Sequence, residues 1–364
     1  MLQIKFDARN QGHWIVMFAV LILGVSISSY LYSTDRYSLV YFGDSASHLL
    51  GARKIVDWMD PGLQQVGTVW LPLPHFLLLP FALIDPMFTS GLAGTAVSLP
   101  SLAITVAILY RMVKTHLGEA AGYISFVAAM LYATNPNILY LGVTAMTEAP
   151  FMLFFVASAY YFQKWSADHL RAKNLVLCSI FVILATLCRY EGWILAAFLV
   201  PFVIFTSFKG NLDSKSKKVE RILLSAISLL GIAAWIGYNA YQYGDPLEFA
   251  NAQYYSASSQ ALDRSIRETL FLQPINVISI YGTTAFMIFG PVLLVAALTG
   301  YICHRRMQGS NSRRILYVYL ALPPLFSIIT ILVGIGEMTY WFNSRFLILL
   351  SPLIILLTAV YLHN

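Results

Sequence analysis

The chain has 364 residues, of which 58% are hydrophobic and only 11% are charged. Soluble globular proteins are about 45–50% apolar and about 25% charged, so this composition excludes a water-soluble enzyme, a disordered chain and a secreted disulfide scaffold. The net charge of +6 does not indicate nucleic-acid binding, because the basic residues lie between apolar stretches, as in membrane proteins. We therefore expect membrane lipids as partners and a single transmembrane domain over residues 1–364, with no separate soluble domain.

Apolar stretches long enough to span a bilayer recur along the whole chain. They predict an all-α, polytopic membrane protein of about ten transmembrane helices, in which the first apolar stretch is an uncleaved span. The predicted spans are 13–33, 92–112, 120–137, 149–164, 174–188, 191–207, 222–242, 276–302, 315–335 and 346–362.

The basic residues predict the orientation of these spans. With the N-terminus inside, the inner loops hold 16 of the 23 Lys and Arg residues, as the positive-inside rule requires. The outer loops hold 12 of the 17 acidic residues. We therefore expect a multi-pass protein of the cell membrane with a cytoplasmic N-terminus and its chemistry on the outer face.

The first outer loop, 34–91, is long and contains the apolar segment Trp70–Pro80. Three prolines in eleven residues oppose an ordinary helix there. Counting the segment as a span would also place the later basic clusters outside. We interpret it as a re-entrant or interfacial piece beside a polar cavity, because irregular backbone at membrane depth has to be covered.

Asp44 stands where a helix can begin in this loop, and His48 follows four residues later. On a helix the two side chains share a face, and a carboxylate beside an imidazole is a candidate proton acceptor with its orienting partner. The alternative is that Asp44 merely caps an interfacial helix. That helix is predicted to continue to about Asp60, before Pro61-Gly62.

Two further outer connections carry charge close to span ends. Glu148 follows Thr147 at the start of a predicted span, where an acid is a functional candidate, although the helix dipole also favours an acid there. The very short connection at Arg189 and Glu191 could bind substrate, or the two side chains could simply pair with each other.

Arg345 precedes the last predicted span, beside Tyr340 and Trp341. It could bind a phosphate in a bidentate manner or be an interfacial arginine whose charge reaches water. The outer loop 243–275 has Asp245 near its start and is rich in aromatic and amide side chains. Such groups suit sugar or headgroup binding, but the loop could equally be an ordinary lid.

The chain contains no Gly-rich phosphate loop, no His-Glu-x-x-His and no Gly-x-Ser-x-Gly. Outer Asp and Glu side chains could hold a divalent metal. A zinc site would have few ligands, since His48 and His75 are the outer histidines.

In their order along the chain, and in their shared position on the predicted outer side of the membrane, these motifs resemble those of the GT-C superfamily of integral-membrane glycosyltransferases. The subgroup that they resemble most includes the protein O-mannosyltransferases and the aminoarabinose transferase of lipid A. The matching pieces are Gly43-Asp44-Ser45 through Arg53, Trp70 through His75, Thr147-Glu148, Arg189-Tyr190-Glu191, Gly244-Asp245-Pro246-Leu247 and Asn343-Ser344-Arg345-Phe346.

The resemblance implies transfer of a sugar from a polyprenyl- or dolichyl-phosphate donor to a glycan, lipid or protein acceptor on the outer face. By the same resemblance, Asp44 and Glu148 correspond to the catalytic acidic positions and Arg345 to a ligand of the donor phosphate. The remaining candidates for substrate or donor-phosphate binding are His48, Arg53, His75, Arg189, Glu191, Tyr340 and Asp245. The chain lacks the Trp-Trp-Asp-Tyr-Gly motif of oligosaccharyltransferases, which argues against en bloc transfer of a glycan to asparagine.

Two alternatives to a transferase remain. A transporter or flippase for a lipid-linked solute would also carry intramembrane charges and broken helices, but the Pro-rich segment at 70–80 has no counterpart in the second half of the chain. A non-catalytic scaffold would tolerate alanine at Asp44 and Glu148.

Overall fold

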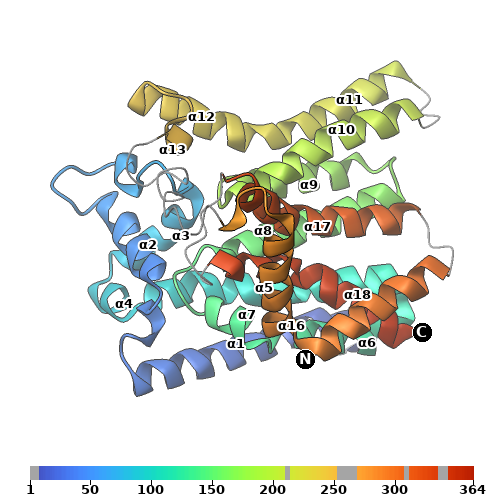
Figure 1. The fold of residues 1–364 in the computed structure, drawn as a ribbon, viewed down its shortest axis with the longest axis horizontal. Coiled ribbons are helices and arrows are strands. Elements are labelled where there is room, and N and C mark those ends of the chain that lie inside the picture. The colour runs from blue at the N-terminus through green and yellow to red at the C-terminus, as the bar shows by residue number, and fades with distance from the viewer. Residues whose placement is uncertain (1–7, 210–213, 252–268, 307–310, 335–342) are drawn as a thin grey trace, which may run out of the picture.

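The computed structural model describes residues 8–209, 214–251, 269–306, 311–334 and 343–364. These residues form helices and connecting turns with no β-strand among them, which confirms the predicted all-α class. Most of the helices run roughly along one direction as a bundle, and short helices gather at one end of it (Figure 1). We call this end the α2–α4 end and the other the opposite end.

Each predicted span contains at least one long or apolar helix. In chain order these are α1 (Ala8–Thr34), α5 (Leu92–Leu117), α6 (Gly122–Ala133), α8 (Glu148–Ala167), α9 (Ala172–Thr186), α10 (Trp193–Lys209), α11 (Lys215–Ala226), α12 (Leu230–Tyr243), α16 (Pro274–Arg306), α17 (Asn311–Leu332) and α18 (Ser351–His363). Seven helical stretches of the described chain are long and apolar enough to cross a membrane. The protein is therefore an all-α polytopic membrane protein.

Helix α8 lies at the centre of the bundle, packed against α5 and α9. Its buried face includes Phe151, Phe155 and Phe162, all with 0% exposure. Neighbouring helices rather than lipid surround α8, so it can begin with a buried charge, Glu148, without meeting hydrocarbon.

The predicted first outer loop folds into a group of short helices. They are α2 (Gly43–Lys54), the 3-10 turn η2 (Leu63–Val66), α3 (Pro72–Ala82) and α4 (Asp85–Ser90), and they gather with α13 (Glu248–Asn251) at the left of Figure 1. Helix α3 packs on α2 and α5, and the Leu73 N–H donates to the Leu187 carbonyl at 3.1 Å, which ties α3 to the end of α9. The predicted helices of this loop are present, and their place at the membrane interface stays a prediction.

Two details of that prediction were wrong. The Pro-rich segment is helical, because Pro72 and Pro74 lie in the first turn, where their missing N–H groups would have no helical partner. Helix α2 ends at Lys54 rather than near Asp60. Arg53 and Lys54 in its last turn suit a helix C-terminus, and the β-branched pair Ile55 and Val56 that follows is a poor continuation of a helix.

Candidate active site

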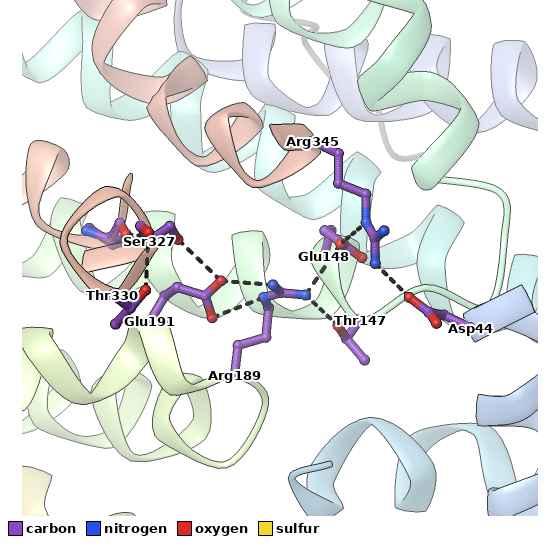
Figure 2. Close-up of polar contacts among 9 residues, drawn as sticks. Asp44, Thr147, Glu148, Arg189, Glu191, Ser327, Thr330 and Arg345 are labelled. Atoms are coloured by element: carbon purple, nitrogen blue, oxygen red, sulfur yellow. Dashed lines mark hydrogen bonds and ion pairs between the residues drawn. The ribbon is translucent and has the colours of Figure 1, made fainter. Parts of the chain in front are cut away.

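Asp44, Glu148 and Arg345 meet at the α2–α4 end although they are far apart in the sequence (Figure 2). The Arg345 Nη2 donates to Asp44 Oδ2 at 2.6 Å, and its Nε donates to Glu148 Oε1 at 3.2 Å. Asp44 comes from the first turn of α2, Glu148 begins α8, and Arg345 lies in the 3-10 segment η6 (Asn343–Leu350) before α18. One guanidinium therefore joins the two acidic residues that were predicted to be catalytic.

A second guanidinium extends this group. Arg189 Nη1 lies 3.2 Å from Glu148 Oε1 and donates to Thr147 Oγ1 at 2.8 Å. Its Nη2 and Nε donate to the two oxygens of Glu191 at 2.7 and 3.2 Å. Arg189 and Glu191 thus pair with each other, as one of the two sequence interpretations anticipated, but Arg189 also joins this pair to Glu148.

The resulting group contains three carboxylates and two guanidinium groups (Figure 2). Glu148 is almost fully buried, with a side-chain exposure of 2%, whereas the Asp44 side chain is 46% exposed. The buried side of the group is therefore fixed by several charged contacts, and Asp44 is the carboxylate that solvent or substrate can reach most easily.

Aromatic rings contact both guanidinium groups. The Arg189 guanidinium lies 4.5 Å from the centre of the Phe346 ring, and that of Arg345 lies 5.0 Å from the same ring and 5.4 Å from Phe42. Such cation–π contacts orient an arginine while its N–H groups remain available for anions. Sequence reasoning missed Phe42, and also Ser327 of α17, whose hydroxyl donates to Glu191 Oε1 at 3.4 Å. No local motif marks either residue.

Helix α5 and Ser45 hold the turn before Glu148 in place. Thr95 and Ser98 of α5 donate from their hydroxyls to the carbonyls of residues 143 and 144, both at 2.6 Å. The Ala145 N–H donates to Ser45 Oγ of α2 at 3.2 Å. Gly94 permits this close approach, since a Cβ there would lie 2.3 Å from the Ala145 nitrogen. These contacts bring α2, and with it Asp44, against the start of α8.

His48 and His75 form a buried pair between α2 and α3. The structure corrects the predicted Asp44–His48 pairing, because His48 Nδ1 lies 3.0 Å from His75 Nε2. His75 Nδ1 lies 3.2 Å from the Leu71 carbonyl oxygen, which can only accept a hydrogen bond. In the neutral pair, His75 Nδ1 is therefore the donor to Leu71 and His75 Nε2 accepts from His48 Nδ1, which leaves His48 Nε2 as an acceptor.

Burial keeps both imidazoles neutral. The two histidines are 3% and 0% exposed, and burial lowers the pKa of His48 to about 4 and that of His75 to about 3. The charges of Arg189 and Arg345 also lower the pKa of His48, and Glu148 opposes them. His48 is thus near the charged group, but its partner in the fold is His75 rather than Asp44.

Three other predicted site residues have partners outside this group or lie beyond the described chain. Arg53 pairs with Asp57 at 2.7 Å and with Asp85 at 2.6 Å. Asp245 accepts from Asn251 Nδ2 at 3.0 Å and from the backbone N–H of residue 247 at 2.8 Å. Tyr340 lies outside the described residues.

A small pocket lies beside Glu148, between α5, α6, α7 (Pro136–Leu141), α8 and η6. It is mostly apolar, and its lining residues are Leu102, Thr105, Tyr132, Ile138, Leu141, Glu148, Ala149, Met152 and Ile348. Glu148 Oε2 is buried and has no hydrogen-bond partner within the described part of the chain. The space is small, so a water molecule or a hydroxyl group that reaches in from a neighbouring ligand could supply the missing donor.

The described residues do not form an evident metal site. No group of three or more His, Cys, Asp or Glu side chains that could hold a metal ion occurs among them. Arg345 bridges Asp44 and Glu148 with its own positive charge.

Part of the chain is similar in sequence to a known protein family. A family model described as dolichyl-phosphate-mannose-protein mannosyltransferase matches residues 74–238, which include Glu148, Arg189 and Glu191. Comparison with curated proteins gives no match.

The fold is similar to that of solved structures. The apo crystal structure of the Archaeoglobus fulgidus oligosaccharyltransferase is similar over 95% of this chain, with a TM-score of 0.53 and 14% identity. The predicted resemblance to the GT-C superfamily is confirmed. The same archaeal enzyme in complex with an inhibitory peptide and a dolichol-phosphate gives a TM-score of 0.54 at 13% identity over 95% of the chain. The structure tethered to an acceptor peptide with an NVT sequon gives 0.56 at 12% identity over 98%. The chain spans 50% of the length of the archaeal chain in each case.

Proposed function

We propose that the protein is a glycosyltransferase that moves a sugar from a polyprenyl- or dolichyl-phosphate donor to an acceptor on the outer face of the membrane. The observation that carries this proposal is the Arg345 guanidinium between Asp44 and Glu148. It combines a solvent-accessible carboxylate, which can act as a base, with a cation able to bind a phosphate. The mannosyltransferase family match and the dolichol-phosphate bound by the archaeal enzyme support a lipid-linked donor.

In the proposed reaction, Asp44 accepts the proton of the acceptor hydroxyl while that oxygen attacks the anomeric carbon. The bond between this carbon and the phosphate oxygen breaks, and the lipid phosphate leaves as an anion, so no strong general acid is required. Arg345 stabilises the charge that develops on the phosphate. A single displacement of this kind inverts the anomeric configuration.

The ion pair between Asp44 and Arg345 also suggests how donor binding prepares the base. A donor phosphate that binds Arg345 competes with Asp44 for the same N–H groups, and a displaced Asp44 is free to accept a proton. Glu148 is held by both arginines and positions them. Its unpartnered Oε2 can accept a hydrogen bond from a water or a hydroxyl group that reaches into the small adjacent pocket.

The test is Asp44→Asn, purified and assayed with a panel of polyprenyl-phosphate sugars. We expect a loss of at least 100-fold in transfer, because general-base catalysis typically contributes about 10²–10⁴-fold. Asp57→Asn is the matched control, since Asp57 is an exposed acid of the same loop that pairs with Arg53. Wild-type turnover by a folded Asp44→Asn protein would refute the assignment. Donor binding without transfer by the native protein would favour transport instead.

A further inference from the structure

A second group of polar side chains lies at the opposite end of the bundle, where α8 ends and α11 begins. It consists of Trp165 near the end of α8, His169 just beyond it and Arg221 on α11, and we call it the Arg221 cluster. Arg221 is 4% exposed and Trp165 is 1% exposed. Arg221 Nη1, Trp165 Nε1 and His169 Nδ1 are all buried and have no hydrogen-bond partner among the described residues.

Several observations bring these side chains together. The Trp165 and His169 rings meet edge to face with their centres 4.7 Å apart. Burial and then the charge of Arg221 lower the pKa of His169, which is consistent with a guanidinium close to the imidazole. Helices α8 and α11 also both pack against α9. The three unpartnered groups therefore belong to one region.

Arg221 has no counter-ion in the part of the chain that the structure describes. The nearby Asp168 is already engaged, since its Oδ2 pairs with Arg171 at 2.8 Å and its Oδ1 accepts from the Leu170 N–H at 3.1 Å. Glu220 is exposed on the surface of α11. A buried charge without a partner is destabilising, so an anion from outside the chain would stabilise this arrangement.

We propose that the Arg221 cluster binds a phosphate group, carried either by a lipid head group or by a free phosphate anion. The planar guanidinium suits the bidentate geometry of phosphate oxygens, and the indole N–H of Trp165 supplies a further donor. The positive charge at this end of the bundle favours such a ligand, because the flanking segments contain Lys164, Lys215, Lys217 and Lys218. This site does not depend on the proposed glycosyl transfer, since it lies at the end of the bundle away from Asp44.

The experiment measures thermal unfolding of the purified native chain and of Arg221→Met in a neutral detergent. Without phosphate, we expect Arg221→Met to unfold at the same or a higher temperature, because it removes an unpaired buried charge. Addition of inorganic phosphate or of phosphatidylglycerol should raise the unfolding temperature of the native chain and leave that of Arg221→Met unchanged. Sodium chloride at equal ionic strength is the control for screening.

Two further variants sharpen the test. Trp165→Phe keeps the ring but removes the N–H donor, so its response to the same ligand should be at least several-fold weaker by titration. Lys217→Gln removes an exposed charge one turn away and should respond like the native chain. A response to phosphatidylglycerol alone identifies a lipid head group as the ligand, and a response to inorganic phosphate identifies the free anion. An equal response of the native chain and Arg221→Met, or no response of either, overturns the proposal.

Discussion

At the scale of single residues, the two acidic groups joined by Arg345 have different surroundings. Glu148 is buried and contacts two guanidinium groups, whereas the Asp44 side chain is 46% exposed and contacts one. A buried ion pair that loses one partner leaves an uncompensated charge, but a half-exposed pair is largely compensated by water. The two residues should therefore differ in their effect on stability.

We expect Glu148→Ala to lower the free energy of unfolding by about 3–5 kcal/mol, because it leaves two poorly exposed arginines without this partner. Asp44→Ala should cost no more than about 1 kcal/mol. Chemical or thermal unfolding in detergent measures both. Equal losses of stability in the two variants would contradict this distinction.

The His48–His75 pair predicts how stability depends on pH. Both imidazoles are neutral in the folded protein, with their pKa lowered by burial to about 4 and about 3. The unfolded chain therefore binds more protons as the pH falls below about 6.5. The stability that the neutral histidine pair contributes is therefore fully present above that pH and is progressively lost as the pH falls towards 4.

The free energy of unfolding, measured from pH 7 to pH 5, should decrease by up to roughly 1.4 kcal/mol per pH unit for each histidine. His75→Gln cannot titrate at this position, so its stability should fall less steeply over the same range. A variant with the slope of the native protein would show that other groups carry the pH dependence.

At the scale of elements, the position of Glu148 depends on how closely α5 approaches the turn before α8. Gly94, Thr95 and Ser98 of α5 contact the backbone of residues 143–145. This turn carries the acid into the charged group, so a change on α5 should act on the site without touching a substrate.

Gly94→Ala places a Cβ against the backbone of Ala145. We expect a loss of about 1–3 kcal/mol in stability, as for other overpacked sites, together with reduced transfer activity. Gly237→Ala on α12 is the matched control, since a Cβ there meets nothing within 4 Å. Equal behaviour of the two variants would show that the contact between α5 and the turn does not position Glu148.

At the scale of the whole molecule, the short helices and the charged group lie at one end of the bundle (Figure 1). The basic start of α11 lies at the other end. The positive-inside rule predicts that the α2–α4 end faces outward. Cysteine labelling tests this orientation because Asp60 and Ser216 are exposed at the two ends.

In a background without Cys178, Cys188 and Cys303, Asp60→Cys should react with a membrane-impermeant maleimide added to intact cells. Ser216→Cys should react only after the membrane is permeabilised. The reverse pattern would invert the topology and move the proposed chemistry to the cytoplasmic face.

Some features of this protein follow from the sequence by itself. Long apolar stretches determine that the chain is helical and polytopic, because each span satisfies its own backbone hydrogen bonds within lipid. Charges at the ends of those stretches, such as Asp44, Glu148 and Arg345, are conspicuous because they are rare in such a composition. Hydropathy and residue type are local properties, so both conclusions could be drawn without a structure.

Only the tertiary structure decided which side chains meet. Arg345 contacts Asp44 across 301 residues and Glu148 across 197, and His48 pairs with His75 rather than with the nearer Asp44. Arg53 and Asp245, equally plausible as candidates, have other partners. A single sequence does not encode these choices in any local pattern, since they depend on the packing of α2, α8 and η6 against one another. The sequence thus determined that lipid surrounds most of the chain and which charged residues are candidates. Packing determined which of these residues form the site.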